Sequence, residues 1–166
     1  MSRIIKILGI DPGTATTGWG LITRKSAHEM QMLNYNVIRT KSKQLLEHRI
    51  EQIFDQLTNL INLNKPDVLA VESVFFNTNT KTAMLVGQAR GAVLLAGRKS
   101  QIQIEEYTPL QVKMAVTGYG RAEKYQVQKM VKTLLNLKEV PKPDDAADAL
   151  AVAITCGLTI NGLKQM

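Results

Sequence analysis

The sequence predicts an α/β fold built on a five-stranded mixed sheet that is flanked by helices. Three strand-like segments come first, helical and strand-like segments then alternate, and the chain ends on helices. Its 166 residues, of which 45% are hydrophobic, match the size of one domain and suffice for an apolar core. We therefore expect a single domain over residues 1–166.

The N-terminal part predicts a meander of three strands, over residues 3–11, 18–23 and 30–38. Five of the eight residues before Asp11 in the first segment are isoleucine or leucine, as expected for a buried strand. Gly13 and Gly18 keep the connection to the second strand tight, so the spacing favours hairpin-connected strands.

A helix, a strand, a helix and a strand follow in that order. Apolar residues recur at helical spacing from Leu46 to Ile61, with Ser42 as a candidate cap. Residues 67–72 form a short strand that is apolar until its last residue, Glu72. Residues 78–98 predict a second helix, and residues 102–107 predict the fifth strand.

The second helix contains Gly87 and Gly91. Each glycine inside a helix costs about 1 kcal/mol relative to alanine. Their four-residue spacing therefore indicates close packing of that helix face against another element.

Three helices complete the chain. Thr108 and Pro109 form a helix start, and that helix ends at Gly118. Residues 121–137 predict the next helix. After a proline-containing linker, residues 144–156 predict the last one, ending at Gly157.

The positive charge is concentrated in one part of the chain. Residues 81–138 contain ten Lys or Arg and three Glu, a net charge of +7, which equals the net charge of the whole protein. Such a region favours a polyanionic partner such as nucleic acid. A lysine-rich solvated surface is the alternative that charge alone leaves open.

Other protein classes are disfavoured by composition. No apolar run approaches the roughly 18 residues of a membrane span, and the N-terminus lacks an export signal, so we expect a cytoplasmic protein. The lone Cys156 cannot form an internal disulfide, and one Cys with two His argues against a closed zinc site built from Cys and His.

Four carboxylates stand where a charge needs a partner or a function. Asp11 and Glu72 each end an apolar strand, and Asp145 and Asp148 lie three residues apart on one helix face. Oxygen ligands of this kind suit Mg²⁺, and a pair of such ions hydrolyses phosphodiesters. Structural roles remain open for Asp145 and its exposed neighbour Asp144, as helix-start acids, and for Asp11, as a turn residue.

These residues lie in six sequence blocks that are spread over nearly the whole chain. The blocks are GIDPGT (9–14) with GWG (18–20), VESVF (71–75), GQARG (87–91), QVK (111–113) with VTGYG (116–120), AEK (122–124) with QV (126–127), and DAADALAVA (145–153). In this order they resemble the RuvC family, the bacterial Holliday-junction resolvases or crossover junction endodeoxyribonucleases. Six blocks together are highly specific.

The resemblance implies a ribonuclease H-like fold, a homodimer, and metal-dependent cleavage of four-way DNA junctions by symmetric, ligatable nicks in two strands of like polarity. The family's catalytic and metal-binding acids correspond to Asp11, Glu72, Asp145 and Asp148. The implied cofactor is Mg²⁺, two ions per site, with Mn²⁺ as a substitute. A branch-migration motor complex is an implied partner.

The resemblance also implies DNA contacts. Lys113 and Lys124 match basic positions used near the scissile phosphate, and Phe75 matches an aromatic that enters the junction. We add Arg121, which lies in the same basic segment, as a DNA-binding candidate. For the lysines a purely solubilising role, and for Phe75 a core position, are the alternatives.

Three rival functions remain at this point. The turn after Asp11 resembles the phosphate-binding turn of actin-like ATPases, but those need a duplicated fold that 166 residues cannot supply. A ribonuclease H-like nuclease acting on RNA is closer. The third rival is a junction-binding module that does not cleave.

Overall fold

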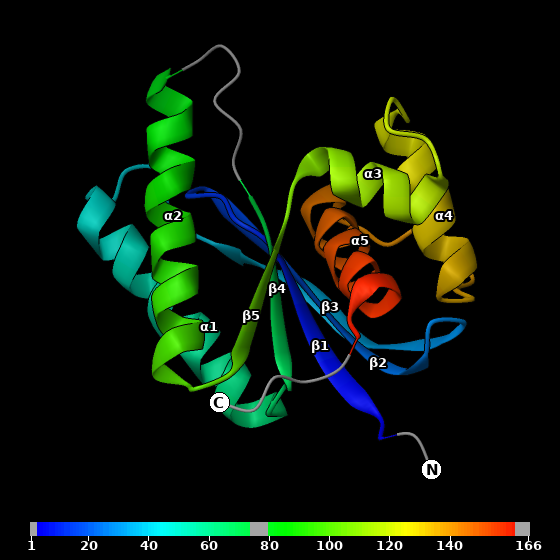
Figure 1. The fold of residues 1–166 in the computed structure, drawn as a ribbon. Coiled ribbons are helices and arrows are strands. Elements are labelled where there is room, and N and C mark those ends of the chain that lie inside the picture. The colour runs from blue at the N-terminus through cyan, green and yellow to red at the C-terminus, as the bar shows by residue number, and fades with distance from the viewer. Residues whose placement is uncertain (1–2, 74–79, 162–166) are drawn as a thin grey trace.

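The expected α/β fold with a five-stranded mixed sheet is confirmed by the computed structural model, which describes residues 3–73 and 80–161 (Figure 1). The sheet has the order β3-β2-β1-β4-β5. Its strands are β1 (Ile5–Asp11), β2 (Thr16–Ser26), β3 (Glu29–Arg39), β4 (Val68–Glu72) and β5 (Gln103–Tyr107). The helices are α1 (Leu46–Asn64), α2 (Thr80–Lys99), α3 (Pro109–Thr117), α4 (Lys124–Leu134) and α5 (Asp144–Thr159).

The direction of the strands brings two carboxylates to one end of the sheet. β1, β2 and β3 form the predicted antiparallel meander, whereas β1, β4 and β5 run parallel. Ile10 of β1 is paired with Val71 of β4. The next residues on the two strands are Asp11 and Glu72, so both carboxylates lie at the carboxyl end of neighbouring strands.

Helices cover both faces of the sheet, with α1 and α2 on one side and α3, α4 and α5 on the other (Figure 1). Side chains of each strand alternate between the two layers. Ile7 and Val68 join the core beneath α5, and Leu8 and Leu69 join the core beneath α1 and α2. All four are completely buried.

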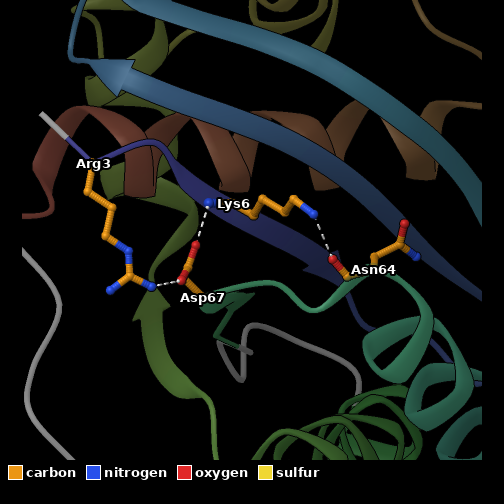
Figure 2. Close-up of polar contacts among 4 residues, drawn as sticks. All are labelled: Arg3, Lys6, Asn64 and Asp67. Atoms are coloured by element: carbon orange, nitrogen blue, oxygen red, sulfur yellow. Dashed lines mark hydrogen bonds and ion pairs between the residues drawn. The ribbon is translucent and has the colours of Figure 1, made fainter. Parts of the chain in front are cut away.

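The amino ends of β1 and β4 are tied together by Asp67 (Figure 2). Its carboxylate pairs with the guanidinium of Arg3 at 2.6 Å and accepts the backbone N–H of Lys6 at 2.8 Å. The Lys6 ammonium donates to the carbonyl of Asn64 at the end of α1. These bonds join segments about 60 residues apart and hold the parallel pair in register at the end of the sheet away from Asp11 and Glu72.

Two glycines allow α5 to lie directly on the sheet. A Cβ on Gly9 would come within 2.1 Å of the Ala149 carbonyl oxygen, and one on Gly18 within 1.9 Å of the Asp145 carbonyl oxygen. Any side chain at either position would therefore push the helix away. The small residues of α5 complete this contact, since Ala146, Ala149 and Ala153 are fully buried.

Three local predictions were wrong. Ser42 does not cap α1, whose N-cap is Leu45, without a side-chain hydrogen bond. Gly157 does not end α5, which continues to Thr159; a Cβ there would meet the Met30 sulfur at 2.5 Å, so the glycine serves packing. Within residues 3–73 and 80–161, Gly87 and Gly91 do not pack against another element, because nothing lies within 4 Å of a Cβ built at either position.

Candidate functional site

The first half of the site is formed by the ends of β1 and β4. Asp11 and Glu72 are the last residues of these strands, and both are partly buried. The chain beyond Glu72 is held by Ser73, whose N–H donates to the Tyr107 carbonyl at 2.8 Å. This bond extends the pairing between β4 and β5 by one step, so the backbone of Glu72 is fixed on both sides.

The turn that follows Asp11 is held by threonine hydroxyls. Thr17 donates to the carbonyl of Gly13 at 2.7 Å, and Thr40 donates to the carbonyl of Thr14 at 2.5 Å. A Cβ on Gly13 would come within 2.4 Å of the Thr16 carbonyl oxygen, so only glycine fits this turn. The turn therefore orients Asp11 without using its carboxylate.

The second half of the site is the first turn of α5. Asp11 is paired across the sheet with Gly18, and Gly18 lies against the backbone of Asp145. This contact places the start of α5 beside the end of β1. Asp145 and Asp148, three residues apart on α5, are both partly buried, as expected for acids that face the protein.

The electrostatics of the four acids indicate that they form one cluster. Burial, followed by the charges of Glu72, Asp148 and Asp145, raises the pKa of Asp11 from 3.8 to about 8. Burial and then the charge of Asp148 raise the pKa of Glu72 from 4.5 to about 7. Burial also raises the pKa of Asp148, against the opposing effect of Lys124. The ionised cluster is therefore short of positive charge.

Two lysines from the basic segment complete the surroundings. A cavity of about 210 Å³ is lined by Glu72, Asp148, Lys113 and Lys124, with apolar walls from α3, α4 and α5. Lys113 comes from α3, which begins on the Thr108 capping box right after β5. Lys124 is the first residue of α4, and its ammonium lies 3.0 Å from a carboxylate oxygen of Asp148.

The donor set fits a hard divalent cation. Carboxylate oxygens are the ligands that Mg²⁺ prefers. The raised pKa values of Asp11 and Glu72 indicate that a nearby cation would stabilise their ionised forms. The Lys124 ammonium supplies part of this positive charge at Asp148. Within residues 3–73 and 80–161, no three His, Cys, Asp or Glu side chains are yet close enough to ligate one ion.

The remaining DNA-binding candidates fall elsewhere. Arg121 is exposed in the turn between α3 and α4 and is not among the residues lining the cavity. Phe75 lies outside the described residues. The structure thus brings together the four acids, Lys113 and Lys124, but not Arg121.

Sequence reasoning missed two features of this site. Gly18 was expected to tighten the connection at the start of the second strand, whereas in β2 its lack of a side chain admits the start of α5. Two glycines flanking Trp19 in a strand are an unusual pattern and signal such a close approach. Asp144 was expected to be a plain exposed acid at the helix start, yet it lies 3.5 Å from the Lys124 ammonium.

Comparison with known proteins agrees with this geometry. The profile of the family described as "Crossover junction endodeoxyribonuclease RuvC" matches residues 7–156, which include all four acids. The chain belongs to the RuvC family. It is 55% identical over 151 residues to the RuvC protein of Halothermothrix orenii and 50% identical over 150 residues to that of Caldicellulosiruptor saccharolyticus. These matches cover about nine-tenths of each chain, 91% in the first case and 90% in the second.

Solved structures of RuvC proteins have the same fold. The structure of Thermus thermophilus RuvC in complex with a Holliday junction substrate matches with a TM-score of 0.88 and 36% identity, covering 93% of both chains. A yeast mitochondrial Holliday junction resolvase shares the fold at 16% identity, with a TM-score of 0.67 over 92% of this chain and 77% of its own.

Membership of the RuvC family makes this protein a phosphodiester hydrolase of a metal-dependent family. The ribonuclease H-like fold expected from the resemblance is thereby confirmed. None of the helices within the described residues is both long and apolar enough to cross a bilayer.

Proposed function

We propose that Asp11, Glu72, Asp145 and Asp148 form the nuclease centre with which this RuvC protein resolves four-way DNA junctions. The observation that carries the proposal is the geometry that brings these acids together: the parallel register of β1 and β4 places Asp11 beside Glu72, and Gly18 lets the start of α5 lie against the sheet next to Asp11. A cluster of carboxylates with raised pKa values beside two lysines suits the binding of metal ions and a phosphate.

The four acids would hold two Mg²⁺ ions, or Mn²⁺ in their place. When bound, such ions activate a water molecule and stabilise charge on the leaving oxygen. The water oxygen bonds to phosphorus and the bond to the 3′ oxygen breaks, which leaves a 5′-phosphate and a 3′-hydroxyl. The strand-end positions of Asp11 and Glu72 keep their carboxylates fixed while the phosphate approaches.

Lys113 and Lys124 would neutralise the phosphate that is cleaved. Both line the cavity that also contains Glu72 and Asp148, so a phosphate close to the acids is also close to the ammonium groups. Charge neutralisation of this kind supports both binding and the negatively charged transition state. Arg121 would contact DNA farther from the acids, and Phe75 would contact unstacked bases at the junction.

The test is incubation with a labelled four-way junction, a matched linear duplex and a matched RNA–DNA hybrid, with and without Mg²⁺. Paired, ligatable nicks in the junction alone, and only with metal, are expected. Preferred cleavage of the hybrid would favour the RNA nuclease instead. Asp148→Asn should bind the junction but not cut it, because a carboxamide is a poor ligand for Mg²⁺. Equal cutting by this variant would contradict the proposed centre.

The homodimer is supported by one face of α2. Met84 and Leu95 are 65% and 53% exposed, and Gly87 and Gly91 lie between them on the exposed side of the helix. Two nicks placed symmetrically need two sites related by a twofold axis. Small residues let a second copy approach closely, and the two large apolar side chains give the contact its apolar area.

Replacing Gly91 by Glu tests this face, because it adds a charge where a second copy would pack. Light scattering is expected to give a dimer for the wild type and a monomer for the variant. A dimeric variant would place the interface elsewhere. We also propose that the protein works with a branch-migration motor as its partner. It would act on chromosomal DNA in the bacterial cytoplasm.

A further inference from the structure

The first acid of α5, Asp144, has no place among the four proposed ligands. We propose that Asp144 is a positioning residue that keeps the Lys124 ammonium at the edge of the site when a divalent ion takes Asp148. This inference rests on the proposed function, since it assumes that Asp148 binds metal.

Lys124 is shared between two carboxylates. Its ammonium lies 3.0 Å from an oxygen of Asp148 and 3.5 Å from an oxygen of Asp144. The Asp148 side chain is 28% exposed, whereas those of Asp144 and Lys124 are 58% and 53% exposed. The ammonium therefore lies between an inner partner that belongs to the acid cluster and an outer partner that does not.

A divalent ion and the Lys124 ammonium compete for the same oxygens of Asp148. Both are cations, so an ion bound at Asp148 repels the ammonium as well as displacing it. The N-terminal end of α4, where Lys124 stands as the first residue, also disfavours a positive charge. Without a second partner, the ammonium would leave for solvent when metal binds.

Asp144 supplies that second partner within the same contact. A small shift of the flexible lysine side chain would shorten this 3.5 Å ion pair to ordinary hydrogen-bonding distance. The ammonium then remains next to the cavity where a phosphate would bind. Asp144 thereby lowers the cost of giving up Asp148, which strengthens metal binding.

A role in capping α5 does not account for this arrangement. The N-cap of α5 is Pro143, and its carbonyl accepts the N–H groups of Ala146 and Ala147. Asp144 could still favour the helix through its dipole, and that effect would change the stability of the protein. It would not depend on whether residue 124 is a lysine.

A double-mutant cycle measures this dependence. Mn²⁺ is titrated calorimetrically into the DNA-free protein, into Asp144→Asn, into Lys124→Met and into the double variant. We expect Asp144→Asn to weaken Mn²⁺ binding about two- to fivefold more with Lys124 present than with it replaced, the range for one exposed ion pair. Asp144→Glu should restore wild-type affinity, because its longer carboxylate still reaches the ammonium.

A cleavage assay adds a second readout. At saturating Mg²⁺ the kcat of Asp144→Asn is expected to stay below the wild-type value, because the Lys124 ammonium no longer remains beside the phosphate, and the Mg²⁺ concentration for half-maximal rate is expected to rise.

Each other outcome has a distinct meaning. An equal loss of Mn²⁺ affinity in both backgrounds would overturn the inference, because Asp144 would then act only by its own charge. A lower melting temperature with unchanged affinity would do the same, in favour of the helix dipole. If the wild-type protein binds no Mn²⁺, then Asp148 is not part of a metal site, and the proposed function fails together with the inference.

Discussion

Replacing Asp11 by Asn is expected to stabilise the metal-free protein while abolishing cleavage. The carboxylate of Asp11 ends a buried strand, and burial together with three neighbouring acids raises its pKa from 3.8 to about 8. In the unfolded chain the group has its ordinary pKa. Folding at neutral pH must therefore either protonate this carboxylate or keep a charge in an unfavourable place, and an amide avoids both.

The pH dependence follows from the direction of the shift. Because the pKa of the folded state is the higher one, Asp11 favours folding below about pH 4, and this contribution is lost as pH rises toward 8. At about 1.4 kcal/mol per pH unit, the loss reaches roughly 4–5 kcal/mol near pH 7.5 and about 1–2 kcal/mol at pH 5. For a chain of this size, the larger value corresponds to a melting temperature higher by on the order of 10 °C in the variant.

The assay is thermal unfolding of wild type and Asp11→Asn in EDTA from pH 5 to pH 8. The difference in melting temperature should widen as pH rises. Mg²⁺ should raise the melting temperature of the wild type more than that of the variant, because a bound cation relieves the same repulsion. Asp55→Asn, which removes an exposed carboxylate of α1, is the matched control and should change little.

Equal melting temperatures for wild type and Asp11→Asn across this pH range would refute the reasoning. Asp11 would then not lie in an acid cluster that lacks a cation. A variant that is less stable at every pH would lead to the same conclusion.

Three further predictions concern packing, register and charge. Gly18→Ala should displace α5 from Asp11 and lower both stability and cleavage, since its Cβ would lie 1.9 Å from the Asp145 carbonyl oxygen. Gln31→Ala, at an exposed position of β3, is the control. Unchanged cleavage by Gly18→Ala would contradict the close approach. Asp67→Ala should lower the free energy of unfolding in urea by about 1–2 kcal/mol, because the Lys6 N–H loses its acceptor. Glu29→Ala, which breaks an exposed ion pair with Lys25, should lower it by under about 0.5 kcal/mol. Similar losses in the two variants would count against the proposed role of Asp67 in joining β1 and β4. Junction affinity measured in Ca²⁺ should fall steeply with salt, and Lys113→Gln should reduce the slope of log K against log salt by about 1; an unchanged slope would mean that this lysine does not contact phosphate.

Most of the secondary structure could be predicted because its signals are local. The apolar run that closes on Asp11, the alternation of helical and strand-like segments, and the start of α3 at Thr108 each depend on neighbours within a few residues. The same holds for Asp145 and Asp148, because residues three positions apart in a helix lie on one face. Errors arose where a local signal had a tertiary purpose, as at Gly157, a predicted helix end that packs against Met30.

The sequence by itself determined the type of fold, the acids that end two strands, the helical pair, and the basic segment that supplies Lys113 and Lys124. Only the tertiary structure decided that these groups meet. Asp11 and Glu72 become neighbours through the parallel register of β1 and β4, and Asp145 reaches them because Gly18 admits α5. The position of Lys124 between Asp144 and Asp148 likewise depends on how α4 packs on α5. Such contacts join residues 20 to 130 positions apart, and they arise from the packing of complementary surfaces, whose partners a one-dimensional pattern does not identify.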